Sequence, residues 1–251
     1  MLENGVEYSG KTVVVGLTGR RASCVAALLL KKQGMKVIGV TIVTTSAEDF
    51  EDAPRLPICH IDDLDSVKTF CEKLNIPFYA TDAKSHYEAE VLDPFVGSKL
   101  TGRANSACYN CNTLRMNILF EKMKKLGADY ISTGHFCKVQ KNLNADEYFI
   151  HSNNDKTSDQ SSLLAGTKSE ILRHLILPLG ELKFEEVNKI AERFELGYTT
   201  QEHTQPFCFQ NKEDYENIIT KRIPKKMLAQ GNIHNISSDL IHGEHEGMIH
   251  H

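Results

Sequence analysis

Residues 11–34 constrain the fold more than any other stretch of the chain, and they read KTVVVGLTGRRASCVAALLLKKQG. The β-branched run at 12–15 is typical of a buried parallel strand. After a break at 16–19, an apolar helical stretch begins at Ser23 and ends at Gly34, a residue that suits the end of a helix. A second β-branched run at 37–43 follows at once. The stretch therefore predicts a β–α–β unit whose parallel strands are joined by a right-handed crossover.

The loop after this first strand is a candidate phosphate site. Its backbone N–H groups would point at a ligand, with the N-terminus of a helix behind them, and that geometry suits phosphate. An ordinary strand-to-helix turn in an α/β domain explains the same residues. The sequence of the loop alone leaves both interpretations open.

Composition and charge describe an ordinary globular protein. The chain has 251 residues, of which 41% are hydrophobic and 25% charged, with a net charge of −4. This charge argues against bulk attraction to nucleic acid, although it leaves room for a local basic face. No apolar run is long enough to span a bilayer, and the first residues resemble no targeting peptide. We therefore expect no membrane partner and a cytoplasmic location, with the mitochondrial matrix as the alternative.

Strand and helix patterns alternate as far as about residue 136. This alternation predicts an α/β fold with a doubly wound parallel sheet. Because ligands of such sheets bind outside the carboxyl ends of the strands, residues 17–23, 41–45 and 133–135 should surround one crevice. We expect a nucleotide-binding domain at 1–200 and a smaller mixed segment at 201–251. The predicted helices are 64–74, 82–96 with a break at Pro94, 114–126, 163–177 and 184–194; the predicted strands are 76–80 and 129–132, with a hairpin in 139–150.

The seven cysteines should be mostly reduced, because their number is odd and no export signal is present. Cys108 and Cys111 form a CxxC pair in a loop expected to lead into a helix, a position that favours the thiolate. Half of a zinc site, a redox pair or no function at all are the alternatives. Taken alone, Cys208 reads as a core cysteine, as do Cys24 and Cys71.

Two polar segments have unremarkable explanations when taken alone. His135 follows a predicted strand and reads as a loop histidine that hydrogen-bonds a neighbour. Asp159 and Gln160 lie in a serine-rich stretch that reads as a solvated loop.

Seven segments in order, spanning about residues 11–250, resemble the tRNA-specific 2-thiouridylase family of PP-loop proteins. The first is VVVGLTGRRASC, where the family has VVVGMSGGVDSS. The other six are GRANSACYNCN, ADYISTGHF, DKTSDQSSLL, LPLGELKFEEVNKIAERFEL, FCFQ and GEHEGMIHH. After the segment that resembles GEHEGMIHH, members of the family continue into a β-barrel domain that this sequence does not include.

The resemblance implies a PP-loop fold and an enzyme that thiolates the wobble uridine of tRNA. ATP with Mg²⁺ would adenylate the 2-carbonyl oxygen, and a persulfide would then deliver sulfur while AMP leaves. An upstream cysteine desulfurase or sulfur-relay protein would load the persulfide. By position, Cys208 would hold the persulfide and Cys111 would be its catalytic partner. The family's ATP-binding positions fall on Gly16, Leu17, Thr18, Gly19, Arg20, Arg21, Ala22, Ser23, Ile42 and Gly134, and its tRNA-binding positions on Ser106, Ala107, Cys108, Ser158, Asp159 and Gln160.

Departures from the family pattern leave other functions open. Arg20 stands where the family has a glycine and Ala22 where it has an aspartate, so Arg20 could block pyrophosphate, or Arg20 and Arg21 could clamp it. A non-catalytic paralogue that binds tRNA or a sulfur-relay protein is the alternative function. A third is a sulfur or iron–sulfur carrier, in which Cys108, Cys111 and Cys208 hold three corners of a cluster.

Overall fold

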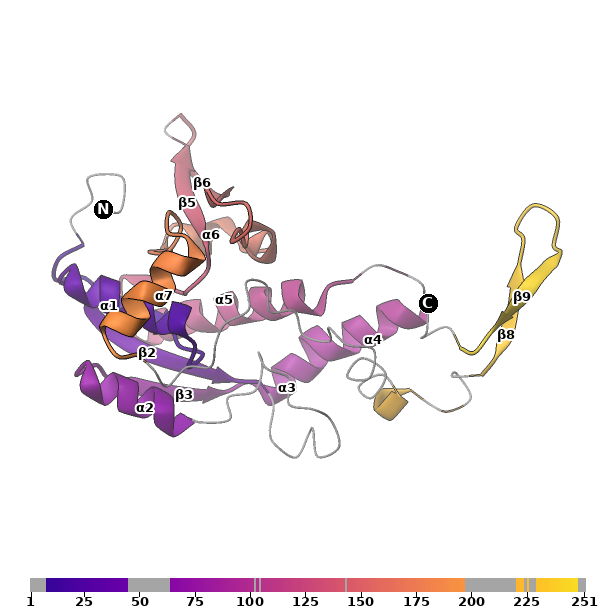
Figure 1. Ribbon diagram of the computed structural model, residues 1–251, viewed down its shortest axis with the longest axis horizontal. Helices are drawn as coiled ribbons and strands as arrows, with labels where there is room; N and C mark the ends of the chain where they lie inside the picture. Colours follow the sequence, from indigo (N-terminus) through magenta and orange to yellow (C-terminus); the bar gives the residue numbers. More distant parts are fainter. Residues whose placement is uncertain are drawn as a thin grey trace.

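The computed structural model describes residues 8–44, 64–101, 103, 105–142, 144–196, 220–223, 225 and 229–247. It confirms the α/β fold. Five parallel strands form one sheet in the order β3-β2-β1-β4-β7 (Figure 1). The strands are β1 (Thr12–Gly16), β2 (Lys36–Val43), β3 (Phe78–Asp82), β4 (Tyr130–Ser132) and β7 (Leu175–Ile176).

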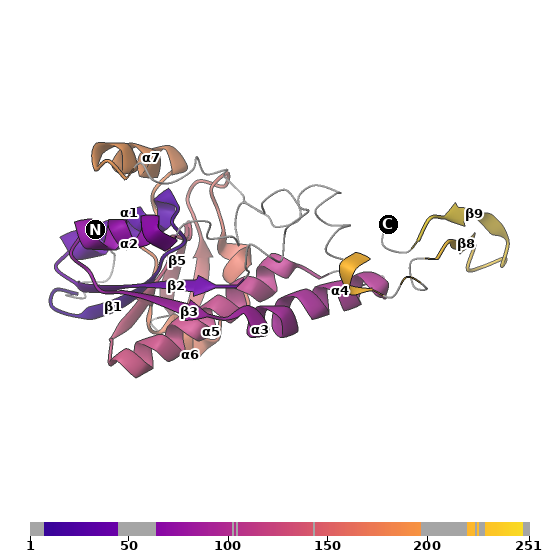
Figure 2. The same cartoon turned by 90° about the horizontal axis from the view of Figure 1, so that it is seen from below.

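Helices cover both faces of this sheet, as Figure 2 shows. On one face lie α1 (Arg21–Lys32), α2 (Leu64–Lys73) and α7 (Phe184–Arg193), packed against Val13 and Val15. On the other lie α5 (Ala107–Leu126) and α6 (Ser169–Leu172), packed against Val14 and Ile131. All four of these strand side chains are fully buried. Burial of alternate residues on opposite faces explains why the strands read as continuous apolar runs.

The strand order reverses between β1 and β4. β1 is followed by α1 and then by β2 on one side, whereas β4 pairs with β1 on the other side. At such a switch point the loops that leave two neighbouring strands diverge and open a crevice. The predicted ligand loops after β1 and β4 therefore border the same place.

The start of α5 differs from the prediction. The turn-like composition of 102–112 predicted a loop, but α5 begins at Ala107, so both cysteines of the CxxC pair lie inside the helix. Ser106 caps the helix, because its hydroxyl accepts a hydrogen bond from the Tyr109 N–H at 3.3 Å. Ala107 and Cys111 are then buried against the helical segment formed by α3 (Lys84–Tyr87), a π-helical turn (Glu88–Leu92) and α4 (Asp93–Leu100).

The predicted helices at 82–96 and 163–177 also need correction. The first continues past Pro94, which lies at the start of α4 directly after the π-helical turn. The second contains only a 3₁₀ turn (Ser161–Leu164) and α6, and its apolar end forms β7. Leu175 pairs with Ile131 at the edge of the sheet, and this tertiary pairing overrides the helical pattern.

Two antiparallel hairpins lie outside the main sheet. The predicted one is β5 (Cys137–Asn142) with β6 (Glu147–Ser152). The second, β8 (Gly231–His234) with β9 (Ile241–His245), stands apart from the sheet in both views (Figures 1 and 2). The expected domain boundary at 200/201 lies outside the described residues. Within the described part of the chain, no helix combines the length and apolarity needed to cross a membrane.

Gly134 allows the loop after β4 to touch the start of α1. A Cβ atom at this position would lie 2.6 Å from both the Ala22 carbonyl carbon and the Ser23 nitrogen. Because these are backbone atoms, Gly134→Ala should lower the free energy of unfolding by about 1–3 kcal/mol, measured by urea denaturation. Gly97→Ala is the matched control, since a Cβ atom there meets nothing within 4 Å and alanine favours a helix. Equal stability of Gly134→Ala and the wild type would contradict this packing.

Candidate functional site

The loop after β1 is held by hydrogen bonds to β2 and by bonds within the loop and the start of α1. The Leu17 N–H donates to the Val40 carbonyl at 2.8 Å, and the Thr41 hydroxyl donates to the Leu17 carbonyl at 2.9 Å. The buried Ser23 hydroxyl donates to the Arg20 carbonyl at 2.9 Å and accepts from the Thr18 N–H at 3.2 Å. These bonds fix the curve of the loop in front of the N-terminus of α1.

Side chains of the predicted ATP positions lie in different surroundings. The Arg21 guanidinium reaches α7, where Nη1 lies 3.2 Å from Asn188 Oδ1 and 3.7 Å from Glu192 Oε1. Ile42 is buried in the core beside α5, so only its backbone can face a ligand. No side chain between Leu17 and Ser23 is acidic, so this loop supplies no carboxylate ligand for Mg²⁺.

Cys111 faces an arginine one helical turn further along α5. The Arg115 Nε–H donates to Cys111 Sγ at 3.2 Å, while Nη2 donates to Thr44 Oγ1 at 3.4 Å, at the end of β2. The Cys111 side chain is nearly buried, with 6% of the residue exposed. A guanidinium beside a sulfur favours the thiolate, the form that acts as a nucleophile.

His135 joins the loop after β4 to the start of α5. Its Nδ1 lies 2.8 Å from Thr133 Oγ1, and its Nε2 lies 2.9 Å from Asn112 Oδ1. The Asn112 amide nitrogen donates to the Cys108 carbonyl at 2.8 Å, which turns its oxygen toward the histidine. Nε2 therefore carries the proton and Nδ1 accepts from Thr133. The prediction of a loop histidine that bonds its neighbours is confirmed.

Burial makes His135 a neutral residue. Desolvation, with the positive charge of Arg115 as the lesser cause, lowers the pKa of His135 to about 4. The side chain thus holds its tautomer across the neutral range and acts as a fixed hydrogen-bonding link.

The remaining described cysteines separate into two kinds. Cys24 and Cys71 are buried in the core, as predicted, and Cys137 is buried in β5. Burial is the main cause that raises the pKa of both Cys71 and Cys137 to about 12, which makes them poor nucleophiles. Cys108 is half-buried at the start of α5. Cys208 lies outside the described residues. In the described ranges no three His, Cys, Asp or Glu side chains are grouped to hold a metal.

The predicted tRNA-binding loop at Ser158–Gln160 bonds within the protein. The buried Ser158 hydroxyl donates to Asp155 at 2.8 Å. Asp159 accepts from the Asn153 N–H at 2.9 Å, and Gln160 Oε1 accepts from the Phe136 N–H at 3.2 Å. These bonds place the loop directly beside the segment that carries His135. Ser106 caps α5 and Ala107 is buried in its first turn. Contact of these two residues with tRNA stays a prediction.

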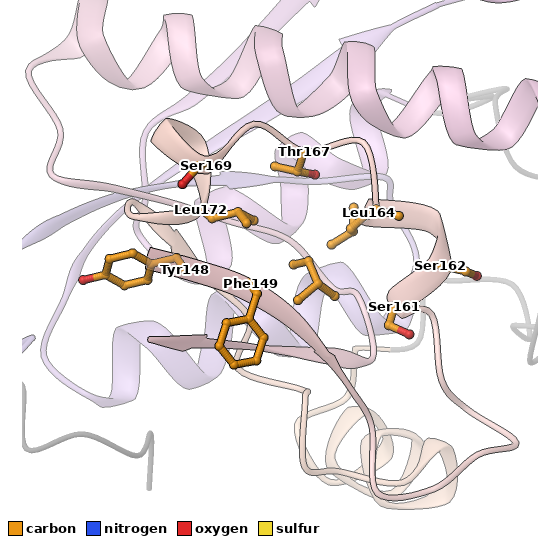
Figure 3. Close-up of a pocket in the computed structure, with 10 residues that line it drawn as sticks. Tyr148, Phe149, Ser161, Ser162, Leu164, Thr167, Ser169 and Leu172 are labelled. Atoms are coloured by element: carbon orange, nitrogen blue, oxygen red, sulfur yellow. The ribbon is translucent and has the colours of Figure 1, made fainter. Parts of the chain in front are cut away.

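A hollow of about 470 Å³ lies between β6, the 3₁₀ turn and α6 (Figure 3), and its lining residue Ser161 is bonded to Asp159 of the Ser158–Gln160 loop. No predicted site residue lines it. Its lining is Tyr148, Phe149, Ile150, Ser161, Ser162, Leu164, Ala165, Thr167, Ser169 and Leu172.

Two residues of the site were not singled out from the sequence. Arg115 donates to Cys111, and Asn112 donates to the Cys108 carbonyl. The spacing of Arg115 from Cys111, four residues along one helix, would have indicated contact had the helix been predicted to start at 107. Thr44, which accepts a hydrogen bond from Arg115, lies within the range 41–45 that was expected to border the crevice.

The chain is similar to proteins of a known family. A model of the family described as tRNA methyl transferase HUP domain matches residues 11–212. The chain is 30% identical over 241 residues to the tRNA-specific 2-thiouridylase MnmA of Clostridium beijerinckii, and 32% identical over 240 residues to that of Clostridium kluyveri. Each alignment covers 95% of this chain and 66% of the relative, so the chain spans just under two thirds of their length.

A solved structure shows the same fold. It is the crystal structure of a 4-thiouridine synthetase–RNA complex with bound ATP, with a TM-score of 0.52 and 16% sequence identity. The match covers 81% of this chain and 47% of that one.

The lowered pKa of His135 predicts a pH dependence of stability. An unfolded histidine titrates at about 6.5, so the unfolded chain binds this proton first. The titration of His135 therefore leaves the free energy of unfolding unchanged above about pH 6.5. Between that pH and about pH 4, the free energy of unfolding falls by about 1 kcal/mol for each unit by which the pH is lowered. His135→Gln should remove this component of the slope in denaturant unfolding measured across that range. Nitrogen NMR of the wild type at about pH 5 should show the signal of one neutral imidazole with its proton on Nε2. This signal should be missing from the spectrum of the variant. An unchanged slope together with a protonated His135 at that pH would contradict the assignment.

Proposed function

Because the chain belongs to the tRNA-specific 2-thiouridylase family, we propose that it is an ATP-dependent sulfurtransferase acting on a uridine of tRNA. The single observation that carries this proposal is the place of Cys111. Its Sγ lies 3.2 Å from Arg115 Nε, and the same guanidinium reaches Thr44 Oγ1, which follows β2, at 3.4 Å. The relative with known structure was crystallised with RNA and ATP, which supports the same two substrates here.

The proposed reaction begins with activation of the uridine and continues with sulfur transfer and release of the enzyme. ATP transfers its adenylyl group to the 2-carbonyl oxygen of the uridine and releases pyrophosphate, which turns a poor leaving group into AMP. The terminal sulfur of a persulfide on Cys208 then bonds to C2 as AMP departs. Cys111 attacks the Cys208 sulfur, so the bond to the transferred sulfur breaks and a Cys111–Cys208 disulfide forms. The sulfur stays on C2, and a cellular thiol reduces the disulfide before an upstream sulfur donor reloads Cys208.

The resemblance to the family also implies two bound groups, Mg²⁺ and an iron–sulfur cluster. The loop after β1 offers no carboxylate, so Mg²⁺ would be held by the phosphates of ATP and not by an acidic side chain in this loop. For an iron–sulfur cluster, the described residues supply the thiols of Cys108 and Cys111, and a third ligand would have to be Cys208.

A non-catalytic paralogue that binds tRNA or a sulfur-relay protein is the second candidate. It is favoured by the loop after β1, where Arg20 replaces a glycine and Ala22 an acid of the family pattern. The Arg21 side chain is held by α7. ATP binding distinguishes the two candidates.

Cys111→Ser should abolish thiolation of tRNA while leaving ATP binding intact, because only the attacking sulfur is removed. We expect ATP to raise the thermal unfolding temperature of the wild type and of this variant, and AMP to be released with tRNA. Cys71→Ala is the control, since its thiol lies in the core, and it should retain thiolation per folded molecule. Should saturating ATP fail to stabilise the wild type while tRNA still binds, the paralogue is the correct function.

A further inference from the structure

We propose that the hollow between β6, the 3₁₀ turn and α6 binds one unstacked base of the RNA substrate, at a nucleotide next to the uridine that is modified. This inference rests on the proposed function for RNA as the partner, and it adds a second place at which the RNA is held. The hollow has a volume of about 470 Å³. Sites for small ligands have volumes of about 300–1,000 Å³, so the space is large enough for a nucleobase.

The walls of the hollow are apolar. Leu164 of the 3₁₀ turn and Leu172 of α6 are buried, and Figure 3 shows their side chains directed toward the same space above β6. Ile150 of β6 packs against the same core cluster, whereas the ring of Phe149 lies on the other side of the strand. Both faces of a nucleobase are apolar, and proteins hold unstacked bases between apolar or aromatic side chains.

Hydroxyl groups surround these apolar walls, from Ser161, Thr167 and Ser169. The Ser161 hydroxyl donates to Asp159 at 2.8 Å, so it can still accept a hydrogen bond from a ligand. The Thr167 hydroxyl oxygen is buried and has no hydrogen-bond partner among the described residues. Because a buried polar group without a partner destabilises a protein, a ligand that supplies one is favoured. The edge of a nucleobase carries both donors and acceptors, which suits hydroxyl groups.

The segment that lines the hollow also touches the start of α5. A Cβ atom at Gly166, within this segment, would lie 2.5 Å from the Tyr109 hydroxyl. Tyr109 directly follows Cys108, so the contact is made by the first turn of the helix that carries the CxxC pair. The bond between Ser161 and Asp159 joins the same segment to the loop predicted to contact tRNA. An RNA whose target uridine lies at the CxxC pair is therefore expected to pass beside the hollow.

One unpaired cation stands at the hollow. Lys168 lies between the lining residues Thr167 and Ser169, is exposed, and has no ion-pair partner in the described part of the chain. It is placed to contact the phosphate of a nucleotide whose base enters the hollow. Exposed acids, Glu147 and Glu170, lie on the flanking elements, so the attraction to phosphate is local. Contacts with the base must then supply most of the affinity.

The test measures binding of an end-labelled RNA stem–loop, with the target uridine in its loop, to the full chain by fluorescence anisotropy without ATP. Ala165 lines the hollow and is exposed, so Ala165→Phe places a ring in the space. This variant should bind the stem–loop about tenfold more weakly, a typical loss when one base loses its stacking contact. Ala165→Ser keeps the hollow open and should bind like the wild type.

Thr167→Val separates recognition of RNA from folding. The Thr167 hydroxyl has no partner in the described protein, so valine should leave the free energy of unfolding unchanged or raise it. Binding of the stem–loop should weaken about fivefold, because the base loses a hydrogen bond. Thr81→Val is the matched control, since the Thr81 hydroxyl on β3 is likewise buried without a described partner. It should leave RNA binding unchanged.

Lys168→Ala should lower the slope of log affinity against log salt concentration by about one, because one phosphate contact is lost. Lys125→Ala removes an exposed cation from the last turn of α5 and should leave the slope unchanged.

The proposal is overturned if folded Ala165→Phe binds the stem–loop like the wild type, or if Thr167→Val binds it as tightly as Thr81→Val does. A free nucleotide is the other source of a base. If UMP or ATP binds the wild type but not Ala165→Phe, while both bind the stem–loop equally, the hollow is a nucleotide site and the proposal is overturned too. Should Ala165→Phe not fold, the two threonine variants decide.

Thiolation of tRNA, measured separately, distinguishes this inference from the proposed function. Weaker RNA binding by the hollow variants of a chain that thiolates no tRNA leaves the inference standing and rejects the sulfurtransferase alone. Thiolation by the wild type together with unchanged RNA binding by the variants does the reverse. A wild type that binds no RNA rejects both.

Discussion

The hydrogen bond between His135 and Asn112 is the contact on which the geometry of the site depends. It ties the loop after β4, which follows the C-terminal end of α5 in the chain, to the first turns of the same helix. The Asn112 amide is itself oriented by the Cys108 carbonyl, and the histidine by Thr133. This chain of bonds sets the rotation of α5 about its axis. Cys111 and Arg115 share one side of the helix because they lie four residues apart, and Arg115 reaches Thr44 at the end of β2.

The loop after β1 is held by hydrogen bonds and packing, while its residues depart from the family pattern. Ser23 closes the loop, and the close approach of Gly134 holds the start of α1 against the loop after β4. The Arg21 side chain reaches Asn188 on α7 and so joins two helices. The backbone of the loop is thus supported by contacts within the protein.

Much of the sheet could be predicted from sequence, because its signals are local. The apolar run Thr12–Gly16 predicts a strand because the sheet is buried on both faces. The glycine after α1 predicts the end of that helix. Residues 175–176 were predicted wrongly, since the pairing with β4 that makes them a strand is not local. The start of α5 was also missed. Its first turns have the composition of a loop, and they are helical because Ser106 caps them and Cys111 is buried against the segment that contains Tyr87. The contact between Arg115 and Thr44 joins residues distant in sequence, and no pattern in one chain marks it.

The central claim of the proposed function is that sulfur passes between Cys208 and Cys111, which requires the two thiols to meet. A short thiol-specific cross-linker added to the full chain, followed by peptide mapping, tests this most directly. The claim predicts a Cys111–Cys208 cross-link as the main product, lost in Cys111→Ser and retained in Cys71→Ala. A Cys208 that cross-links only to other cysteines, with or without ATP and tRNA, would contradict it.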